Sequence, residues 1–159
     1  MNVCELVEHS VKVAQANVRQ HDPVHVVTSA EPLWVRGEFG RLSQVFVSLL
    51  INALRYSSPQ GIVTIRAERA GRHCYVRVSD NGMGIPPEEL TAIFAPYVRL
   101  GDARTKAHHG MGVGLAIVRE IVTAYGVAVT VFSEGRGCGA EFVVRLPLVQ
   151  AGPGFPVGR

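Results

Sequence analysis

The sequence predicts an α+β fold, a two-layer α/β sandwich in which a mixed, mostly antiparallel sheet carries helices on one face. Three observations predict it. Long segments have apolar residues at helical spacing, and short segments have them at every second position. Apolar residues make up 47% of the 159 residues, enough for one globular core. We expect one domain over residues 1–148 and a disordered Gly/Pro-rich tail over residues 149–159.

The first half of the chain is expected to contain two helices separated by two short strands. Helical spacing predicts an amphipathic helix over residues 5–20, which His21-Asp22-Pro23 ends. Residues 24–28 and 33–36 are strand candidates. The longest helix is expected over residues 38–57, because its apolar face is broad and a proline and a glycine follow it.

The second half of the chain is expected to supply most of the sheet. Period-two alternation predicts strands over residues 62–68 and 73–79, and two last strands over residues 127–133 and 140–146. A helix is expected over residues 112–125, opening out of glycines. The alternation of the first two strands places these side chains on single faces: Val63, Ile65 and Ala67, and Cys74, Val76 and Val78.

Charge and cysteine usage exclude several kinds of protein. The formal net charge is only +3, and the basic residues are scattered except over residues 99–109, so we expect no nucleic-acid partner. The longest apolar run, residues 45–51, is far too short to span a membrane, and no leader opens the chain. Cys4, Cys74 and Cys138 form no C-x-x-C pair, which favours reduced thiols and a cytoplasmic location.

A polar stripe interrupts the apolar face of the longest helix. It consists of Ser48, Asn52, Arg55 and Tyr56, which lie one above another at helical spacing. An unpaired polar group in apolar surroundings is costly, so the amide of Asn52 needs a partner. The ordinary alternative to a ligand is a hydrogen bond from Asn52 to the backbone of a neighbouring loop.

Two glycine-rich segments are candidates for ligand binding. Asp80-Asn81-Gly82-Met83-Gly84 directly follows a strand; Asn-Gly is also a hairpin signal, but Ile85-Pro86-Pro87 begins a helix instead of a second strand. Residues 110–115 open another helix, whose amide N–H groups and dipole favour a phosphate. An ordinary tight turn is the alternative there. The spacing is neither a dinucleotide fingerprint nor a P-loop.

In this order the segments resemble the nucleotide site of histidine kinases, a branch of the ATPase superfamily that also includes gyrase, the ninety-kilodalton heat-shock chaperone and the mismatch-repair ATPase. Residues 41–57 resemble the asparagine box, residues 80–86 the first glycine box, residues 93–99 the phenylalanine box and residues 110–118 the second glycine box. The resemblance reaches Leu148 and implies the Bergerat-type ATP-binding fold.

The resemblance implies a role for each matching position. Asn52 would coordinate Mg²⁺ through its amide oxygen, Arg55 would reach the phosphates, and Tyr56 would pack against the adenine of ATP. Asp80 would accept a hydrogen bond from the adenine amino group. Arg99 would act in phosphoryl transfer with Asn52 and Arg55, from a mobile lid over residues 96–110. The remaining contacts to the nucleotide would come from Gly82, Gly84, Ile85, Phe94, Gly110, Gly112, Val113, Gly114 and Leu115.

One position departs from the family pattern. Ser48 stands where the family usually has a second asparagine or a glutamate, one turn before Asn52. The missing carboxylate weakens any interpretation as a gyrase-type or chaperone-type hydrolase. Phosphoryl transfer depends mainly on positioning and charge stabilisation, so it does not require that group.

No histidine of the chain has the context of the family's phosphoacceptor, which is followed by an acidic residue and later a proline. His21 comes nearest, but Pro23 follows too soon. The resemblance therefore implies a catalytic half that transfers the γ-phosphoryl group of Mg·ATP to a separate histidine-containing dimerisation domain, with a response regulator downstream. Two alternatives remain open: an anti-sigma-factor-type serine kinase of the same superfamily, and a pseudokinase scaffold.

Overall fold

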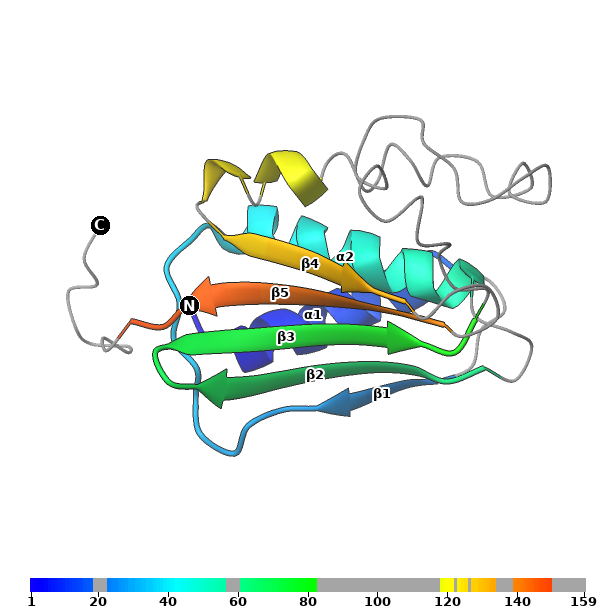
Figure 1. Cartoon of the computed structure of the whole chain (residues 1–159), viewed down its shortest axis with the longest axis horizontal. Helices are drawn as coiled ribbons and strands as arrows, with labels where there is room; N and C mark the ends of the chain where they lie inside the picture. Colours follow the sequence, from blue (N-terminus) through cyan, green and yellow to red (C-terminus); the bar gives the residue numbers. More distant parts are fainter. Residues whose placement is uncertain are drawn as a thin grey trace.

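The computed structural model describes residues 1–18, 23–56, 61–82, 118–121, 123–125, 127–133 and 139–149. In this part of the chain, α1 (Val3–Ala16) and α2 (Phe39–Tyr56) lie on one face of a five-stranded sheet (Figure 1). The strands are β1 (Val24–Val27), β2 (Val63–Ala70), β3 (His73–Asp80), β4 (Ala128–Phe132) and β5 (Ala140–Pro147). The predicted α+β class, with helices on one face of a mixed sheet, is confirmed.

The sheet has the strand order β1-β2-β3-β5-β4. β1 pairs with β2 in parallel, and the other neighbours are antiparallel. The parallel pair needs a crossover connection, which α2 provides. β5 lies between β3 and β4, so β3 has a strand on each side, and Asp80 at its end pairs with both Val63 and Ala140.

The first helix begins earlier and ends earlier than the predicted range 5–20. Asn2 caps α1, because its Oδ1 accepts hydrogen bonds from the amides of Cys4 at 3.1 Å and Leu33 at 3.3 Å. After Ala16 the backbone turns: the Asn17 amide bonds the Ala14 carbonyl oxygen at 3.1 Å. The periodicity of apolar residues indicated the helix, but its ends are set by these capping bonds.

The strand predicted over residues 33–36 is wrong. Trp34 and Val35 form only isolated bridges, to Asn2 and Leu148 respectively. The backbone groups of this segment join the two ends of the domain: the terminal amino group of Met1 donates to the Val35 carbonyl oxygen at 2.8 Å, and the Val149 amide donates to Trp34, also at 2.8 Å. Its neighbours are therefore terminal segments rather than a strand of the sheet.

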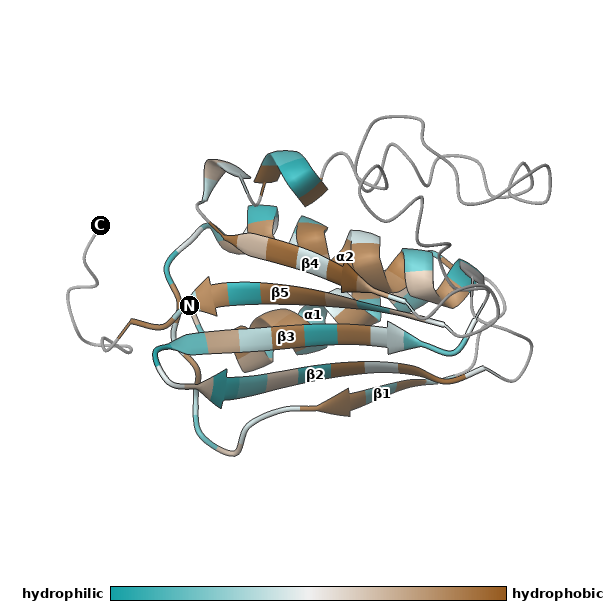
Figure 2. Ribbon diagram, viewed as in Figure 1, coloured by the Kyte–Doolittle hydropathy of each residue, from teal (hydrophilic) through white to brown (hydrophobic). Residues whose placement is uncertain are grey.

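The core lies between the two helices and one face of the sheet. The apolar faces predicted for β2 and β3 are confirmed, since all six of their alternating side chains are buried. Hydrophobic and hydrophilic residues accordingly alternate along the strands in Figure 2. α2 contributes Phe46, one of the two largest fully buried side chains among the described residues, together with Leu42, Leu49 and Leu50. Among the described residues no helix has the length and apolar character needed to cross a membrane.

Burial makes the Cys74 thiol unreactive. It raises the pKa of Cys74 to about 12, and the nearby Cys4 adds to the shift. At pH 8 only about one thiol in ten thousand would then be ionised, and the thiolate is the nucleophile. We expect iodoacetamide to leave Cys74 unmodified in the folded chain and to modify it in urea, as measured by peptide mass spectrometry. Native labelling of Cys74 as fast as that of the half-buried Cys4 would contradict this expectation.

Candidate nucleotide site

Asn52 places an amide oxygen inside the molecule, without a hydrogen-bond partner in the part of the chain that the structure describes. α2 packs against β2 and β3 and has an almost wholly apolar inner face, yet it carries Asn52, which is only 8% exposed. Its Oδ1 is buried, and no hydrogen-bond partner for it is found among the described residues. The ordinary alternative to a ligand was a hydrogen bond between Asn52 and the backbone of a neighbouring loop. Within the described residues, Oδ1 makes no such bond. A buried acceptor without a partner costs about 1–3 kcal/mol, so a cation or a donor is favoured at this position.

The flanking positions of the polar stripe become more exposed toward the helix end. Ser48, one turn before Asn52, is half-buried, and Arg55 in the last turn is exposed. A cation in the last turn also interacts favourably with the helix dipole, which is a structural reason for Arg55. Tyr56 is the last residue of α2. Along α2 the stripe thus passes from the half-buried Ser48 through the buried Asn52 to the exposed Arg55.

Asp80 is a mostly buried carboxyl group at the end of β3. Desolvation raises its pKa to about 6, although hydrogen bonds from the amides of Gly82 and Ala140 oppose the shift. The Gly82 amide lies 2.8 Å from Asp80 Oδ1. An ionised carboxylate has about four acceptor positions, so these two bonds leave capacity for a further donor. The group is therefore a hydrogen-bond acceptor that is ionised, but poorly solvated, at neutral pH.

The loop after Asp80 is held from both neighbouring strands. On the β2 side, the amide of Ile62 donates to Asn81 Oδ1 at 2.9 Å. On the β5 side, the amide of Gly139 donates to the Gly82 carbonyl oxygen at 3.1 Å. The hairpin alternative for Asn81-Gly82 is excluded, because β2 and β5 already occupy both edges of β3.

Asn52 and Asp80 lie toward the same end of the molecule. The C-terminal ends of α2 and β3 point the same way in Figure 1. The pairing explains this arrangement: only six residues separate Tyr56 from Val63, the first residue of β2, and Val63 pairs with Asp80. In the described residues no group of three or more His, Cys, Asp or Glu side chains could hold a metal ion. Among the described residues, the candidate acceptors at this end are the amide oxygen of Asn52 and the carboxyl group of Asp80.

Residues 37–150 match the family described as histidine kinase-, DNA gyrase B- and HSP90-like ATPases. The chain belongs to this family. The match includes α2 and all the strands except β1, and so both Asn52 and Asp80.

Individual relatives of this ATPase domain are sensor histidine kinases. The sensor histidine kinase ZraS of Salmonella typhi is 34% identical over 152 residues, which is 94% of this chain but 31% of that protein. The mycobacterial sensor histidine kinase MprB has a structure with a TM-score of 0.80 and 26% identity, covering 93% of this chain and 97% of that one. Full-length ShkA, solved in complex with AMPPNP, gives a TM-score of 0.76 and 27% identity over 95% of this chain and 31% of its own. The chain thus spans less than a third of the length of ZraS.

The structure of the ATPase domain describes only part of the predicted site. It includes Asn52, Arg55 and Asp80 with their side chains, Gly82, and the backbone of Tyr56. The lid over residues 96–110 and the nearest acceptor candidate, His21, lie outside the described residues. So do these site residues, whose roles stay predictions: Gly84, Ile85, Phe94, Arg99, Gly110, Gly112, Val113, Gly114 and Leu115.

Three histidines lie among the described residues, and each is part of a helix or strand of the domain. His9 on α1 stacks against Phe39 with ring centroids 5.2 Å apart. His25 lies in β1 and His73 in β3, as predicted. None of the three therefore has the hairpin context of a phosphoacceptor.

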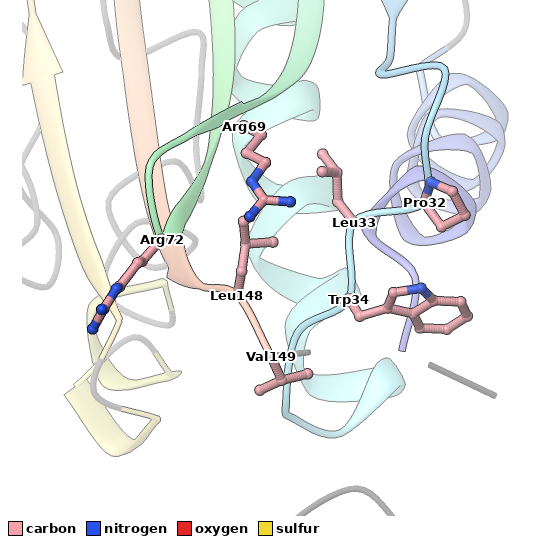
Figure 3. A pocket seen from close by; sticks show the side chains of 7 residues that line it. All are labelled: Pro32, Leu33, Trp34, Arg69, Arg72, Leu148 and Val149. Atoms are coloured by element: carbon pink, nitrogen blue, oxygen red, sulfur yellow. The ribbon is translucent and has the colours of Figure 1, made fainter. Parts of the chain in front are cut away.

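A cavity of about 580 Å³ lies at the opposite end of β3 from Asp80, beside the β2–β3 turn (Figure 3). It is lined by Pro32, Leu33, Trp34, Arg69, Arg72, Leu148 and Val149. Arg69 Nε already donates to the Gly71 carbonyl oxygen within the turn, at 3.2 Å. No residue of the predicted nucleotide site lines this cavity.

Sequence reasoning missed the residues that hold the Asp80 loop in place. An asparagine before a glycine is a general sign of side-chain bonding to backbone, and closely spaced glycines indicate a backbone with positive φ. Both signals are present, at Asn81 and in the glycine series that ends at Gly139. Neither signal identifies which residue the loop bonds. Ile62 and Gly139 come next to the loop only because distant strands pair with β3.

Proposed function

We propose that this chain is the ATP-binding catalytic domain of a sensor histidine kinase. The observation that carries the proposal is the buried Oδ1 of Asn52, which has no partner among the described residues, in a chain of this family. The similarity to a sensor histidine kinase over 94% of the chain supports the same conclusion. A cytoplasmic location, expected from the sequence, is part of the proposal.

The proposed nucleotide is ATP, read at its base by Asp80. AMPPNP, the ligand of ShkA, is an ATP analogue. The adenine amino group is a donor, and the carboxyl of Asp80 is a mostly buried acceptor that can take a further hydrogen bond. Gly82, which has no side chain beside that carboxyl, would let the base approach the backbone closely, and Tyr56 would pack against it.

Asn52 suits the Mg²⁺ that accompanies ATP. This ion takes few protein ligands, prefers oxygen and keeps water and phosphate oxygens around it. Asn52 Oδ1 is an oxygen without a described partner, so the residue present fits the ion. When bound, Mg²⁺ would neutralise phosphate charge. The exposed guanidinium of Arg55, one turn further along α2, would bind the phosphates beside it. Arg99 is proposed to stabilise the transferred charge from the lid.

The phosphoryl acceptor is proposed to be a histidine outside this chain. An imidazole nitrogen would form the new bond to the γ-phosphorus while the bond to the bridging oxygen breaks, and ADP would leave. The proton of the imidazole would pass to the acidic residue that follows the histidine. The partners are then a histidine-containing dimerisation domain, tethered or separate, and a response regulator downstream.

The alternatives draw less support. The relatives named above are sensor histidine kinases, which does not favour an anti-sigma-factor-type serine kinase. The pseudokinase interpretation rests on Ser48 alone, and phosphoryl transfer relies mainly on positioning and charge stabilisation. Measured transfer therefore decides between kinase and scaffold.

We expect the 159-residue chain to stay unlabelled when it is incubated alone with γ-labelled ATP and Mg²⁺. Adding a dimeric helical hairpin that carries a histidine followed by an acidic residue should yield a phosphoprotein that is labile to acid and stable to base. The affinity between two untethered parts should be low, because tethering supplies a high effective concentration. Gel autoradiography after acid and base treatment measures the outcome.

The matched control is the same hairpin with its histidine replaced by glutamine, which should take no label. Stoichiometric labelling of the chain itself on His21 would contradict the proposal, because the chain would then carry its own acceptor. Labelling of a serine in a partner would favour the anti-sigma-factor-type alternative instead.

A further inference from the structure

Gly139 lies directly before β5 and packs against the end of β3 without a side chain. Its φ is +72°, a conformation that L side chains rarely adopt. A Cβ atom built there would overlap the carbonyl oxygen of Asp80 and lie 2.9 Å from Asn81 Cα. These neighbours are backbone atoms, so a larger residue could be accommodated only by moving the end of β3.

Three hydrogen bonds connect Ser133, through Gly139, to the Asp80 carboxyl. Ser133, just after β4, donates its hydroxyl to the Gly139 carbonyl oxygen at 2.7 Å. The Gly139 amide donates to the Gly82 carbonyl oxygen at 3.1 Å. The Gly82 amide in turn donates to Asp80 Oδ1 at 2.8 Å. Ser133 and Gly139, at the two ends of the connection between β4 and β5, are thus linked to the carboxyl group through one residue of the loop, Gly82.

We propose that Gly139 is a positioning residue for nucleotide binding, holding the loop after β3 so that the Asp80 carboxyl is kept buried and aimed at the base. This inference rests on the proposed function, in which Asp80 reads adenine. Gly139 acts through Gly82 and Asp80, and the Ser133 hydroxyl, just after β4, holds Gly139 in turn. The last hairpin of the sheet therefore belongs to the nucleotide site through these contacts.

Gly71 separates this role from an ordinary need for glycine in a turn. It has a similar φ of +63° in the β2–β3 turn, but a Cβ there would meet nothing within 4 Å. Alanine imposes the same kind of backbone strain at both positions. Only at Gly139 would it also press on Asp80 and Asn81.

The test compares Gly139→Ala with Gly71→Ala in the 159-residue chain. ATP affinity is measured by calorimetry, and the pKa of Asp80 by NMR titration of its carboxyl carbon. For Gly139→Ala we expect ATP affinity to fall about tenfold or more, the size of one lost hydrogen bond to a charged group. The pKa of Asp80 should fall from about 6 toward 3.8 as the carboxyl becomes solvated. Gly71→Ala should leave both quantities unchanged.

Unchanged ATP affinity and an unchanged titration in Gly139→Ala would overturn the inference. Equal losses of affinity in both glycine variants would also overturn it, because strain alone would then be the cause. A shifted titration with unchanged affinity would overturn the role of Asp80 in reading the base while supporting the link from Gly139 to the carboxyl. If ATP does not bind the unmodified chain, the proposed function is overturned. The pKa of Asp80 in Gly139→Ala would still test whether Gly139 keeps the carboxyl buried.

Ser133→Ala keeps the test decisive if Gly139→Ala fails to fold. It removes the hydroxyl that bonds Gly139 and leaves the backbone of residue 139 unchanged. We expect a several-fold loss of ATP affinity and a smaller fall in the pKa of Asp80. If neither changes in a variant whose circular dichroism matches that of the unmodified chain, the inference is overturned.

Discussion

Replacing Asn52 with alanine is expected to abolish phosphoryl transfer to the histidine hairpin while leaving the fold intact. The substitution removes the proposed protein ligand of Mg²⁺, and we expect a loss of about a hundredfold or more, the size seen when one group that stabilises transferred charge is removed. The dependence of ATP affinity on Mg²⁺ should disappear as well. Initial rates of labelling and calorimetry with and without Mg²⁺ measure these effects.

Asn52→Ala should not destabilise the fold, although it should abolish phosphoryl transfer. Asn52 Oδ1 is buried without a described partner, so its removal relieves a cost rather than breaking a bond. Alanine is also the better helix former. We therefore expect the free energy of unfolding of Asn52→Ala to stay unchanged or to rise by about 1 kcal/mol, as measured in urea.

Gln44→Ala, an exposed change two turns earlier on α2, is the control and should affect neither transfer nor Mg²⁺ dependence. A stable Asn52→Ala variant that transfers phosphate at the normal rate would contradict the assignment of Asn52. A variant that unfolds would contradict the view that its oxygen is unpaired.

Asp80 is expected to make stability fall as pH rises. Its pKa is about 6 in the folded chain and ordinarily 3.8, so between these values the folded chain keeps a proton that the unfolded chain has lost. The stabilising contribution is complete below pH 3.8 and lost above about pH 6, and amounts to roughly 3 kcal/mol. Asp80→Asn cannot titrate. The difference in unfolding free energy between the two proteins, measured in urea from pH 3.5 to 7, should follow this curve, and a flat difference would contradict it.

ATP affinity should rise, whereas stability falls, as the Asp80 carboxyl loses its proton. The adenine amino group donates best to the ionised carboxyl, so affinity should fall as pH drops below about 6. Asp80→Asn should weaken ATP binding about tenfold or more at pH 7.5, since a hydrogen bond to a charged group is worth roughly 1.5–3 kcal/mol. The ratio of affinities of the two proteins at each pH cancels the titration of ATP itself.

Guanine nucleotides provide the control for base reading. GTP presents an oxygen where ATP presents the amino group, so the unmodified chain should prefer ATP. Asp80→Asn should reduce that preference, because an amide can turn its NH₂ toward the oxygen. If ATP and GTP bind the unmodified chain equally well, Asp80 does not read the base.

The predicted fold was most accurate where one local pattern decided the outcome. α2 was expected over residues 38–57 and spans Phe39–Tyr56, because a long apolar stripe followed by proline and glycine leaves few alternatives. β2 and β3 followed from strict alternation, and their buried faces were as predicted. The segment over residues 33–36 has strand-like composition, but a strand also needs a partner of sufficient length, and the terminal segments beside it supply only single bridges.

The site was predictable in its residue types and less so in its contacts. The position of Asn52 on an apolar helix face and of Asp80 before a glycine loop follow from the printed order of residues. The burial and hydrogen bonding of these two side chains do not follow from the order of residues. Burial of the Asp80 carboxyl and the shift of its pKa arise because β2 and β5 flank β3, and β5 begins sixty residues later in the chain.

The sequence by itself determined the class of fold, the family resemblance and the polar residues that could meet a nucleotide, because these depend on periodicity and on residue types at short spacing. Tertiary structure alone decided that Asn52 Oδ1 lacks a partner in the described part of the chain, and that the end of β3 leaves no room for a Cβ atom at Gly139. The reason is physical: burial and hydrogen bonding depend on which distant segments pack together. Sheet order, with β5 placed between β3 and β4, is the outcome of that packing.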